Sequence, residues 1–250
     1  MTATADDHRL AHDLATETGA LLLNVRRQKV ADGVSTGELK DAGDQAAHNL
    51  IVERLAELRP DDAVLSEEGK DDLGRLNANR VWIVDPLDGT REFSEAGRSD
   101  WAVHIALVTN GLPIAGAVAL PAQGVTFSTV DAPLLPAQSP DAPRVIVSRT
   151  RRPPAAVTLA EELGAQYIEM GSAGAKAMAV LQGEADIYAH SGGQYEWDNC
   201  APVAVCVAAG LHCSRLDGSP LLYNNADTYL PDLLICRPEW VERSLEILNK

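Results

Sequence analysis

The segment that most constrains this chain is residues 82–90, where an apolar strand leads directly into two aspartates and a Gly-Thr pair. Burial of the carboxylates of Asp85 and Asp88 at a strand end is costly unless a partner holds them. Pro86 restricts Asp85 to an extended backbone, so we expect the strand to stop there. Gly89 allows a tight turn, after which backbone N–H groups can face an anion. Carboxylates for a hard cation beside such N–H groups are the components of a metal-assisted phosphatase.

Other interpretations of this segment are less specific or fit less well. An acidic turn after a strand would also contain Asp, Pro and Gly, which are the usual turn residues. A calcium loop requires aspartates two positions apart, whereas Asp85 and Asp88 are three apart. An aspartyl-phosphate phosphatase likewise has its nucleophile and acid two positions apart. The spacing and the intervening Pro86 therefore rank that mechanism low.

Three further acidic clusters occur along the chain. Residues 66–69, Ser-Glu-Glu-Gly, follow a short apolar run, and residues 41–44 are expected to open an amphipathic helix. Asp198 precedes a run of small apolar residues over 201–211 that predicts a buried helix. Each cluster has a structural alternative, which is exposure to solvent for Glu67 and helix capping for the aspartates of the other two.

In their order along the chain, the four clusters resemble the inositol monophosphatase superfamily of magnesium-dependent, lithium-sensitive phosphatases. The family pattern D-P-[IL]-D-[GS]-T matches residues 85–90, and W-D-x-[AC]-A-[GP] matches residues 197–202. The resemblance covers nearly the whole chain. One departure is Asp41, which stands where many relatives have Thr, three positions before the aspartate that is Asp44 here.

Within the superfamily, the chain most resembles the 3'(2'),5'-bisphosphate nucleotidase branch of the CysQ type. The indications are Arg-Glu-Phe at 91–93, the ending Cys-Ala-Pro at 200–202, and Lys176. The resemblance implies removal of the 3'-phosphate of 3'-phosphoadenosine 5'-phosphate, a step of sulfonucleotide turnover in sulfate assimilation. An inositol-1-phosphate or fructose-1,6-bisphosphate phosphatase is the alternative within this class. A non-catalytic regulatory or metal-buffering protein on the same fold is the alternative outside it.

The resemblance also implies a metal site and its catalytic residues. Two or three magnesium ions would be held by the side chains or carbonyls of Glu67, Asp85, Leu87, Asp88 and Asp198, with lithium as an inhibitor. Thr90 and Asp44 would orient the attacking water, with Asp44 accepting its proton through the Thr90 hydroxyl. Glu67 is placed among the catalytic residues as well.

The implied substrate contacts are spread over both halves of the chain. Backbone N–H groups of Gly89 and Thr90 would hold the reacting phosphate, and the further contacts would come from Arg91, Ser172, Lys176, Tyr195 and Asp198. Arg91 and Lys176 are assigned to the second phosphate or the nucleotide, and Tyr195 to the base. The segment 171–176 lacks the Gly and Ser/Thr that flank a P-loop lysine, so a helix start packed on a sheet and a phosphate contact both stay open.

The composition limits the classes of molecule that the chain is expected to bind. A net charge of −15 argues against polymeric nucleic acid and anionic membranes, and it favours a small phosphorylated substrate whose charge metal ions can offset. Neither the polar residues 2–13 nor the longest apolar stretches resemble a signal peptide or a membrane span. Four cysteines without a C-x-x-C pair indicate reduced thiols and a cytoplasmic location, and the six histidines are expected to be structural or on the surface. A homodimer is expected only by analogy with the family.

Hydrophobic periodicity predicts a first half, residues 1–135, of α+β type and a second half, 143–250, of α/β type, joined by a proline-rich linker at 131–143. The expected helices lie at 7–27, after Asp44, at 154–163, 172–182, 199–210 and 238–249. The expected strands lie at 62–65, 81–84, 101–108, 114–120, 124–130, 144–148, 165–170, 185–189 and 232–236, with residues 101–130 antiparallel. The family resemblance implies that these elements form a layered α/β/α/β/α sandwich with the site between the halves.

Overall fold

Two five-stranded sheets form the frame of the computed structural model, which describes residues 2–137 and 142–250. Sheet A lies in the first half of the chain and consists of β1 (Ala63–Ser66), β2 (Val81–Asp88), β3 (Ala102–Thr109), β4 (Leu112–Leu120) and β5 (Val125–Ser128). Its strand order follows the sequence, with β1 and β2 parallel and the other neighbours antiparallel. The predicted antiparallel portion is therefore confirmed.

Strand β2 continues past the point where its end was predicted. It runs to Asp88, although the pairing with β3 shifts register between Asp85 and Asp88. Pro86 has no N–H for the ladder, so it interrupts the pairing without ending the strand. The prediction that the strand stops at Asp85 was wrong, and both aspartates lie on one buried strand.

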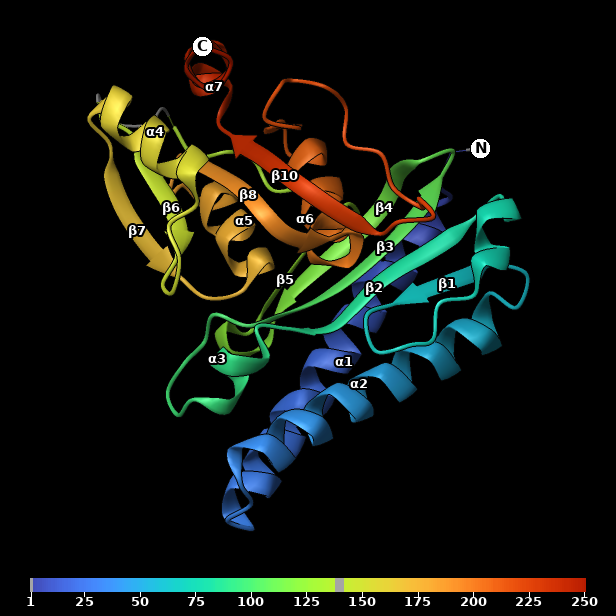
Figure 1. Cartoon of the computed structure of the whole chain (residues 1–250). Helices are drawn as coiled ribbons and strands as arrows, with labels where there is room; N and C mark the ends of the chain where they lie inside the picture. The colour runs from blue at the N-terminus through green and yellow to red at the C-terminus, as the bar shows by residue number, and fades with distance from the viewer. Residues whose placement is uncertain (1, 138–141) are drawn as a thin grey trace.

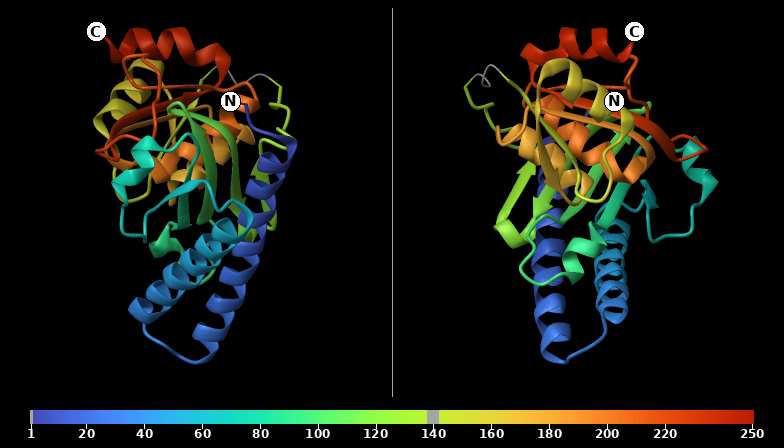
Figure 2. Two further views of the ribbon diagram at one scale, coloured as in Figure 1. Left: turned by 90° about the vertical axis from the view of Figure 1, so that its right-hand side faces the viewer. Right: turned by 60° about the vertical axis from the view of Figure 1, so that its left-hand side comes forward.

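Two long helices, α1 (Ala5–Ala31) and α2 (Thr36–Leu58), cover one face of sheet A. Each begins with a capping box, formed by Thr4 in α1 and by Ser35 in α2. Residues 41–44 therefore lie inside α2, and the prediction that they open this helix was wrong. Figure 2 shows that the two helices reach beyond the sheets and are joined at their far end. The core between the helices and the sheet includes Leu14, Leu22, Ile51, Leu55, Trp82, Val103, Ile105 and Leu107.

Sheet B belongs to the second half of the chain. It consists of β6 (Arg144–Ser148), β7 (Gln166–Met170), β8 (Ile187–Tyr195), β9 (His212–Ser214) and β10 (Tyr229–Cys236), in the order β7-β6-β8-β10-β9. β6 pairs in parallel with β7 and β8, whereas β10 runs antiparallel to β8 and β9. The sequence did not predict β9, and it predicted a shorter β8, because the stretch 190–195 is too polar and glycine-rich to look like a strand.

Helices α4 (Pro154–Leu163) and α7 (Val241–Leu248) pack on the outer face of sheet B. The start of the predicted helix 238–249 is a separate 3-10 turn, η3 (Pro238–Trp240). Two further 3-10 turns, η1 (Leu73–Asn77) and η2 (Pro121–Gln123), and the short helix α3 (Thr90–Ser94) connect the strands of sheet A.

Helices α5 (Ala173–Leu181) and α6 (Glu196–Ala208) fill the space between the two sheets (Figure 1). Both are apolar on nearly all sides, as a helix between two sheets must be. Small residues allow close packing, since a Cβ at Gly116 of β4 would lie 2.8 Å from the Cβ of Ala204 in α6. The predicted α/β/α/β/α sandwich is thus confirmed. One apolar core lies between the two sheets, and one lies on the outer face of each sheet.

The connection between the sheets crosses the predicted linker at 131–143. Residues 138–141 of it lie outside the described residues, and the described remainder contains neither helix nor strand. Each sheet falls within one predicted half, whereas the division into two domains at 1–135 and 143–250 stays a prediction. No helix within residues 2–137 and 142–250 combines the length and the apolar character that crossing a membrane requires.

Candidate active site

Three carboxylates from two distant segments meet where the two halves of the chain adjoin. Asp85 and Asp88 lie on β2, and Asp198 lies in the first turn of α6. Each offers one oxygen, and these three oxygens lie within 4.8 Å of one another. The structure therefore brings together three of the four carboxylates that were predicted as metal ligands.

Asp88 is held by the start of α5. Its Oδ1 accepts the N–H of Ala173 at 3.1 Å, and its Oδ2 accepts the N–H of Gly174 at 2.7 Å. The Nε2 of His104 lies 3.2 Å from the same Oδ2. Burial alone would raise the pKa of Asp88, but the positive potential of His104 and these hydrogen bonds outweigh it and lower the pKa.

Asp85 is the most deeply buried of the three, with 1% of its surface exposed. Its Oδ1 accepts the N–H of Leu87 at 3.1 Å, which fixes the carboxylate against its own strand. Burial and the negative charges of Glu67 and Asp88 raise the pKa of Asp85 well above its usual range. This environment disfavours the charged form of the carboxyl, and a cation beside it would offset that cost.

Asp198 does not cap α6 but lies in its first turn. Its Oδ2 accepts the backbone N–H of Tyr195 at 2.6 Å, which directs the carboxyl back toward the helix start. Burial, followed by repulsion from Asp88, raises the pKa of Asp198 to about 7. The helix begins at Glu196, so the predicted start at residue 199 was wrong by one turn.

Glu67 follows β1 and joins the cluster from the side. Much of its surface is exposed, as the structural alternative proposed, yet it lies close enough to Asp88 for the charge of that residue to act on its carboxyl. Burial of the carboxyl raises its pKa to about 7, with repulsion from Asp88 adding to the effect. The charge of Glu67 thus repels those of the other carboxylates, and a cation between them would offset this repulsion.

Asp44 and Thr90 approach the cluster from α2 and α3. A Cβ at Gly43 would lie 2.9 Å from Leu87, so α2 passes very close to the end of β2. Burial raises the pKa of Asp44 to about 7, and the charges of Glu68 and Asp41 add to the rise. Asp41, which replaces the usual Thr, therefore makes Asp44 a stronger base electrostatically.

The expected hydrogen bond between Thr90 and Asp44 is absent from the described residues. Thr90 Oγ1 instead donates to the carbonyl of Leu87 at 3.4 Å. The same carbonyl was predicted as a metal ligand. The role of Thr90 as a proton link to Asp44 therefore stays a prediction.

Gly89 turns the chain between β2 and α3. Its φ of +85° lies in the left-handed region, and a Cβ there would come within 2.8 Å of the Cβ of Ser172. Only glycine fits this approach between the two halves of the chain. Arg91, two residues further on, has an exposed side chain.

The segment around Lys176 forms a buried helix start. Ser172 Oγ accepts the N–H of Ala175 at 2.9 Å and so caps α5. Lys176 is 4% exposed, and its Nζ donates to the carbonyls of Gly171 and Ser172. Burial lowers the pKa of Lys176. Of the two interpretations that the sequence left open, this arrangement favours packing, because the donors of Lys176 face its own loop and not open space.

Tyr195 lies beside the carboxylates and is 43% exposed. Its ring stacks on Trp197 with a centroid distance of 5.0 Å and an interplanar angle of 8°. Tyr229 meets it edge-on at 5.9 Å and is equally exposed. These exposed aromatic rings offer a flat apolar surface next to Asp198.

Sequence reasoning missed His104, because all six histidines were expected to be structural or on the surface. This residue is fully buried on β3 and is the register partner of Asp85 on β2. A histidine within an otherwise apolar strand was the available signal. Its neighbours on β2 could not be assigned without the strand register.

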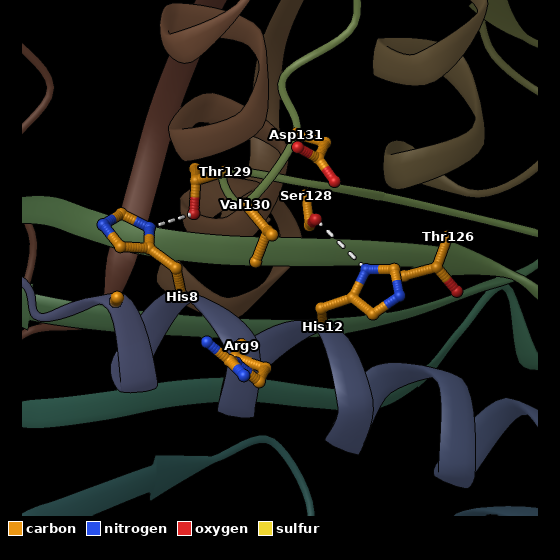
Figure 3. A pocket seen from close by; sticks show the side chains of 9 residues that line it. His8, Arg9, His12, Thr126, Ser128, Thr129, Val130 and Asp131 are labelled. Carbon is orange, nitrogen blue, oxygen red and sulfur yellow. Dashed lines mark hydrogen bonds between the residues drawn. The ribbon is translucent and has the colours of Figure 1, made fainter.

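A pocket of about 650 Å³ lies elsewhere, between α1 and the end of β5 (Figure 3). None of its lining residues is among the predicted site residues. His8 Nδ1 lies 2.7 Å from Thr129 Oγ1, and His12 Nδ1 lies 3.1 Å from Ser128 Oγ. These contacts tie α1 to sheet A and agree with the structural role expected of these histidines.

The carboxylate cluster fits a hard divalent cation. Its donors are all oxygens, and the raised pKa values of Glu67, Asp85 and Asp198 indicate negative charge that lacks a counterion. Magnesium prefers oxygen ligands and retains some of its waters, so a site supplied by a few carboxylates suits it.

Comparison with known proteins agrees with this site. A model of the inositol monophosphatase family matches residues 6–247. The chain is 54% identical over 231 residues to the 3'-phosphoadenosine 5'-phosphate phosphatase of Mycobacterium tuberculosis, covering 89% of this chain and 86% of that relative. It is 34% identical over 202 residues to the 3'(2'),5'-bisphosphate nucleotidase CysQ of Shigella flexneri, covering 76% and 81% of the two chains.

A solved structure shows the same fold. The crystal structure of CysQ from Bacteroides thetaiotaomicron, a bacterial member of the inositol monophosphatase family, aligns with a TM-score of 0.79 at 27% identity. The alignment covers 93% of this chain and 97% of that one. The sequence match, the fold and the carboxylate cluster agree, and this chain belongs to the inositol monophosphatase family.

Proposed function

We propose that this protein is a magnesium-dependent phosphomonoesterase that removes the 3'-phosphate of 3'-phosphoadenosine 5'-phosphate, giving AMP and phosphate. The observation that carries the proposal is the cluster of Asp85, Asp88 and Asp198, whose oxygens lie within 4.8 Å of one another. The Mycobacterium tuberculosis relative that bears the name of this activity is 54% identical to the chain and supports the choice of substrate. The reaction would serve sulfonucleotide turnover in sulfate assimilation.

The metal site is proposed to take two or three magnesium ions. The residues that would hold them are Glu67, Asp85, Asp88, Asp198 and the carbonyl of Leu87. Bound magnesium would neutralise charge on the phosphate and on the leaving oxygen and would acidify a water molecule. Lithium is proposed to inhibit, because it matches magnesium in size but carries half its charge.

The proton of the attacking water is assigned to Asp44. With a pKa of about 7, its carboxyl is available as a base at neutral pH and above. Thr90 would orient the water, which requires its hydroxyl to turn from the carbonyl of Leu87 toward Asp44. Glu67 is also proposed as a catalytic residue, in addition to its role as a metal ligand.

The substrate is proposed to extend from the carboxylates toward the exposed aromatic rings. The N–H groups of Gly89 and Thr90 would hold the reacting phosphate at the start of α3. Arg91 is the exposed cation nearest to them in sequence and is assigned to the second phosphate. Tyr195 would stack on the base. Ser172 and Lys176, which are buried, would act on the substrate only by shaping the loop at 171–172.

A substrate panel tests this proposal. Phosphate release would be measured for 3'-phosphoadenosine 5'-phosphate, inositol-1-phosphate and fructose-1,6-bisphosphate at saturating magnesium. We expect the highest kcat/KM for the bisphosphate nucleotide. A preference for inositol-1-phosphate or the sugar bisphosphate would replace the substrate assignment within the same chemistry. Absence of release from every member would favour a non-catalytic protein.

The cellular location, the partners and the oligomeric state of the protein are proposed as well. The four cysteines are free thiols, which suits the reducing cytoplasm. The net charge of −15 supports small phosphorylated substrates as partners and not polymeric nucleic acid. A homodimer is proposed because Leu112 and Val207, which line one apolar pocket, are each about half exposed. Light scattering at two protein concentrations would test the dimer.

A further inference from the structure

We propose that His104 is a positioning residue that holds Asp88 and the start of α6 in the arrangement that binds the metal. The inference rests on the proposed metal site, and nothing in the motifs of the family points to this histidine. Its ring is fully buried between the elements that carry the carboxylates.

One imidazole ring contacts both halves of the chain. Its Nε2 lies 3.2 Å from Oδ2 of Asp88, which belongs to sheet A. Its Nδ1 lies 3.0 Å from the carbonyl of Trp197, the residue immediately before Asp198 in α6. The same Nδ1 is 4.0 Å from Oδ2 of Asp85. His104 therefore fixes the separation between the carboxylate of Asp88 and the helix turn that carries Asp198.

The start of α5 is shaped around this ring. A Cβ at Gly174 would overlap Nε2 of His104, so only glycine fits there. The close approach lets the N–H of Gly174 reach Oδ2 of Asp88 at 2.7 Å. Asp88 is thus held by two backbone donors of α5 and by a close charge contact with His104 on β3, and removal of the imidazole would remove that contact.

Packing alone does not account for a histidine at this position. Its neighbours on the same face of β3 are Ala102, Ala106 and Val108, which belong to the apolar core between the sheets. A polar ring in such a row costs free energy unless its nitrogens are satisfied. Here Nδ1 is paired with the carbonyl of Trp197, whereas Nε2 lies 3.2 Å from Asp88 without a well-formed hydrogen bond. A polar group this close to a metal ligand orients that ligand.

The experiment compares two substitutions that each keep one contact. Gln at position 104 can place an amide nitrogen near the position of Nε2 and so retain Asp88. Asn is shorter, reaches the position of Nδ1, and retains only the carbonyl of Trp197. Magnesium binding to the metal-free proteins would be measured by calorimetry without substrate, and unfolding by denaturant would be measured in parallel. His8→Asn is the matched control, because its Nδ1 contact to Thr129 lies outside the carboxylate site.

We expect His104→Asn to weaken magnesium binding by about 10- to 100-fold, and His104→Gln to weaken it much less. The two metal-free variants should unfold at similar denaturant concentrations, and His8→Asn should bind magnesium as the natural protein does. Equal losses in Asn and Gln would assign His104 to packing and overturn the inference. Unchanged or tighter binding in His104→Asn would also overturn it, since the ring would then act as a competing positive charge.

This measurement is separate from the proposed reaction. Because binding is read without substrate, unchanged affinity in His104→Asn overturns the inference even if the substrate panel confirms the phosphatase. A selective loss of affinity in that variant supports the inference even if none of the panel is hydrolysed.

Discussion

The N–H of Gly174 donates to Oδ2 of Asp88 over 2.7 Å, and this bond joins the end of a strand in sheet A to a helix that lies between the sheets. The carboxylate of Asp88 is therefore both a candidate metal ligand and a link between the two halves of the chain. Asp198 differs, because its hydrogen bond goes to Tyr195 within its own half. Substitution of the two aspartates should separate these roles.

Asp88→Asn should abolish activity and also destabilise the protein. The amide keeps one acceptor but turns an NH2 group toward Ala173 or Gly174, each of which donates to the present carboxylate. We expect a loss of about 1–3 kcal/mol in the free energy of unfolding and of at least about 100-fold in kcat/KM. Phosphate release and denaturant unfolding measure the two effects. Near-normal turnover at saturating magnesium would contradict the ligand assignment.

Asp198→Asn should abolish activity without destabilising the metal-free protein. The amide oxygen can still accept the N–H of Tyr195, and the change removes a buried charge that lies close to Asp88. We expect a loss of at least about 100-fold in kcat/KM and a free energy of unfolding equal to or above that of the natural protein. Calorimetry should show weaker magnesium binding. Full activity combined with lower stability would assign the residue to the helix alone.

The sequence singled out Asp85, Asp88 and Asp198, whose carboxylates lie together in the structure, because motif spacing and chemistry agree at these residues. It could not predict how the two halves meet, since strand register and helix packing depend on contacts distant in sequence. His104 was missed for this reason. The sequence left packing and phosphate contact open for Lys176, whose ammonium in the structure donates to carbonyls of its own loop.

The errors in the fold are local. Asp residues were taken as helix starts, whereas Ser35 caps α2 and Glu196 begins α6. Propensity does not decide between neighbouring capping residues, because Ser and Asp cap helices about equally well. The strand end at Asp85 was misplaced because pairing of β2 with β3 resumes at Asp88, opposite Ala102, despite the local effect of Pro86.

Lys176→Met should reduce stability without changing substrate preference. The ammonium donates to the carbonyls of Gly171 and Ser172, and methionine fills the space without those bonds. We expect a loss of about 1.5–3 kcal/mol in the free energy of unfolding. The ratio of kcat/KM for 3'-phosphoadenosine 5'-phosphate to that for 3'-AMP should stay constant. Lys250→Met, at an exposed ion pair, is the control. A selective loss toward the bisphosphate would return Lys176 to the second phosphate.

Tyr195→Ala should raise KM for the nucleotide and leave inositol-1-phosphate hydrolysis unchanged. The exposed ring is stacked on Trp197 beside Asp198, and base stacking on an aromatic ring contributes about 1–3 kcal/mol. This corresponds to a rise of about 5- to 150-fold in KM for the nucleotide. Tyr195→Phe keeps the ring and should behave as the natural protein does. Equal losses toward both substrates would show that the ring instead supports the position of Asp198.

The metal-free protein should become less stable as pH rises, and magnesium should reverse this. Asp44, Glu67 and Asp198 have ordinary pKa values of 3.8, 4.5 and 3.8 and folded values of about 7. The folded chain therefore keeps protons that the unfolded chain releases, and this stability, present below about pH 4, is lost as pH rises through about 7. We expect the Tm of the metal-free protein to fall by roughly 5 °C or more between about pH 5.5 and about pH 8. Because magnesium takes the place of those protons, it should raise Tm more at the higher pH. Asp198→Asn should flatten the fall, and a Tm that stays constant or rises with pH would show that the carboxyls are charged in the folded metal-free protein.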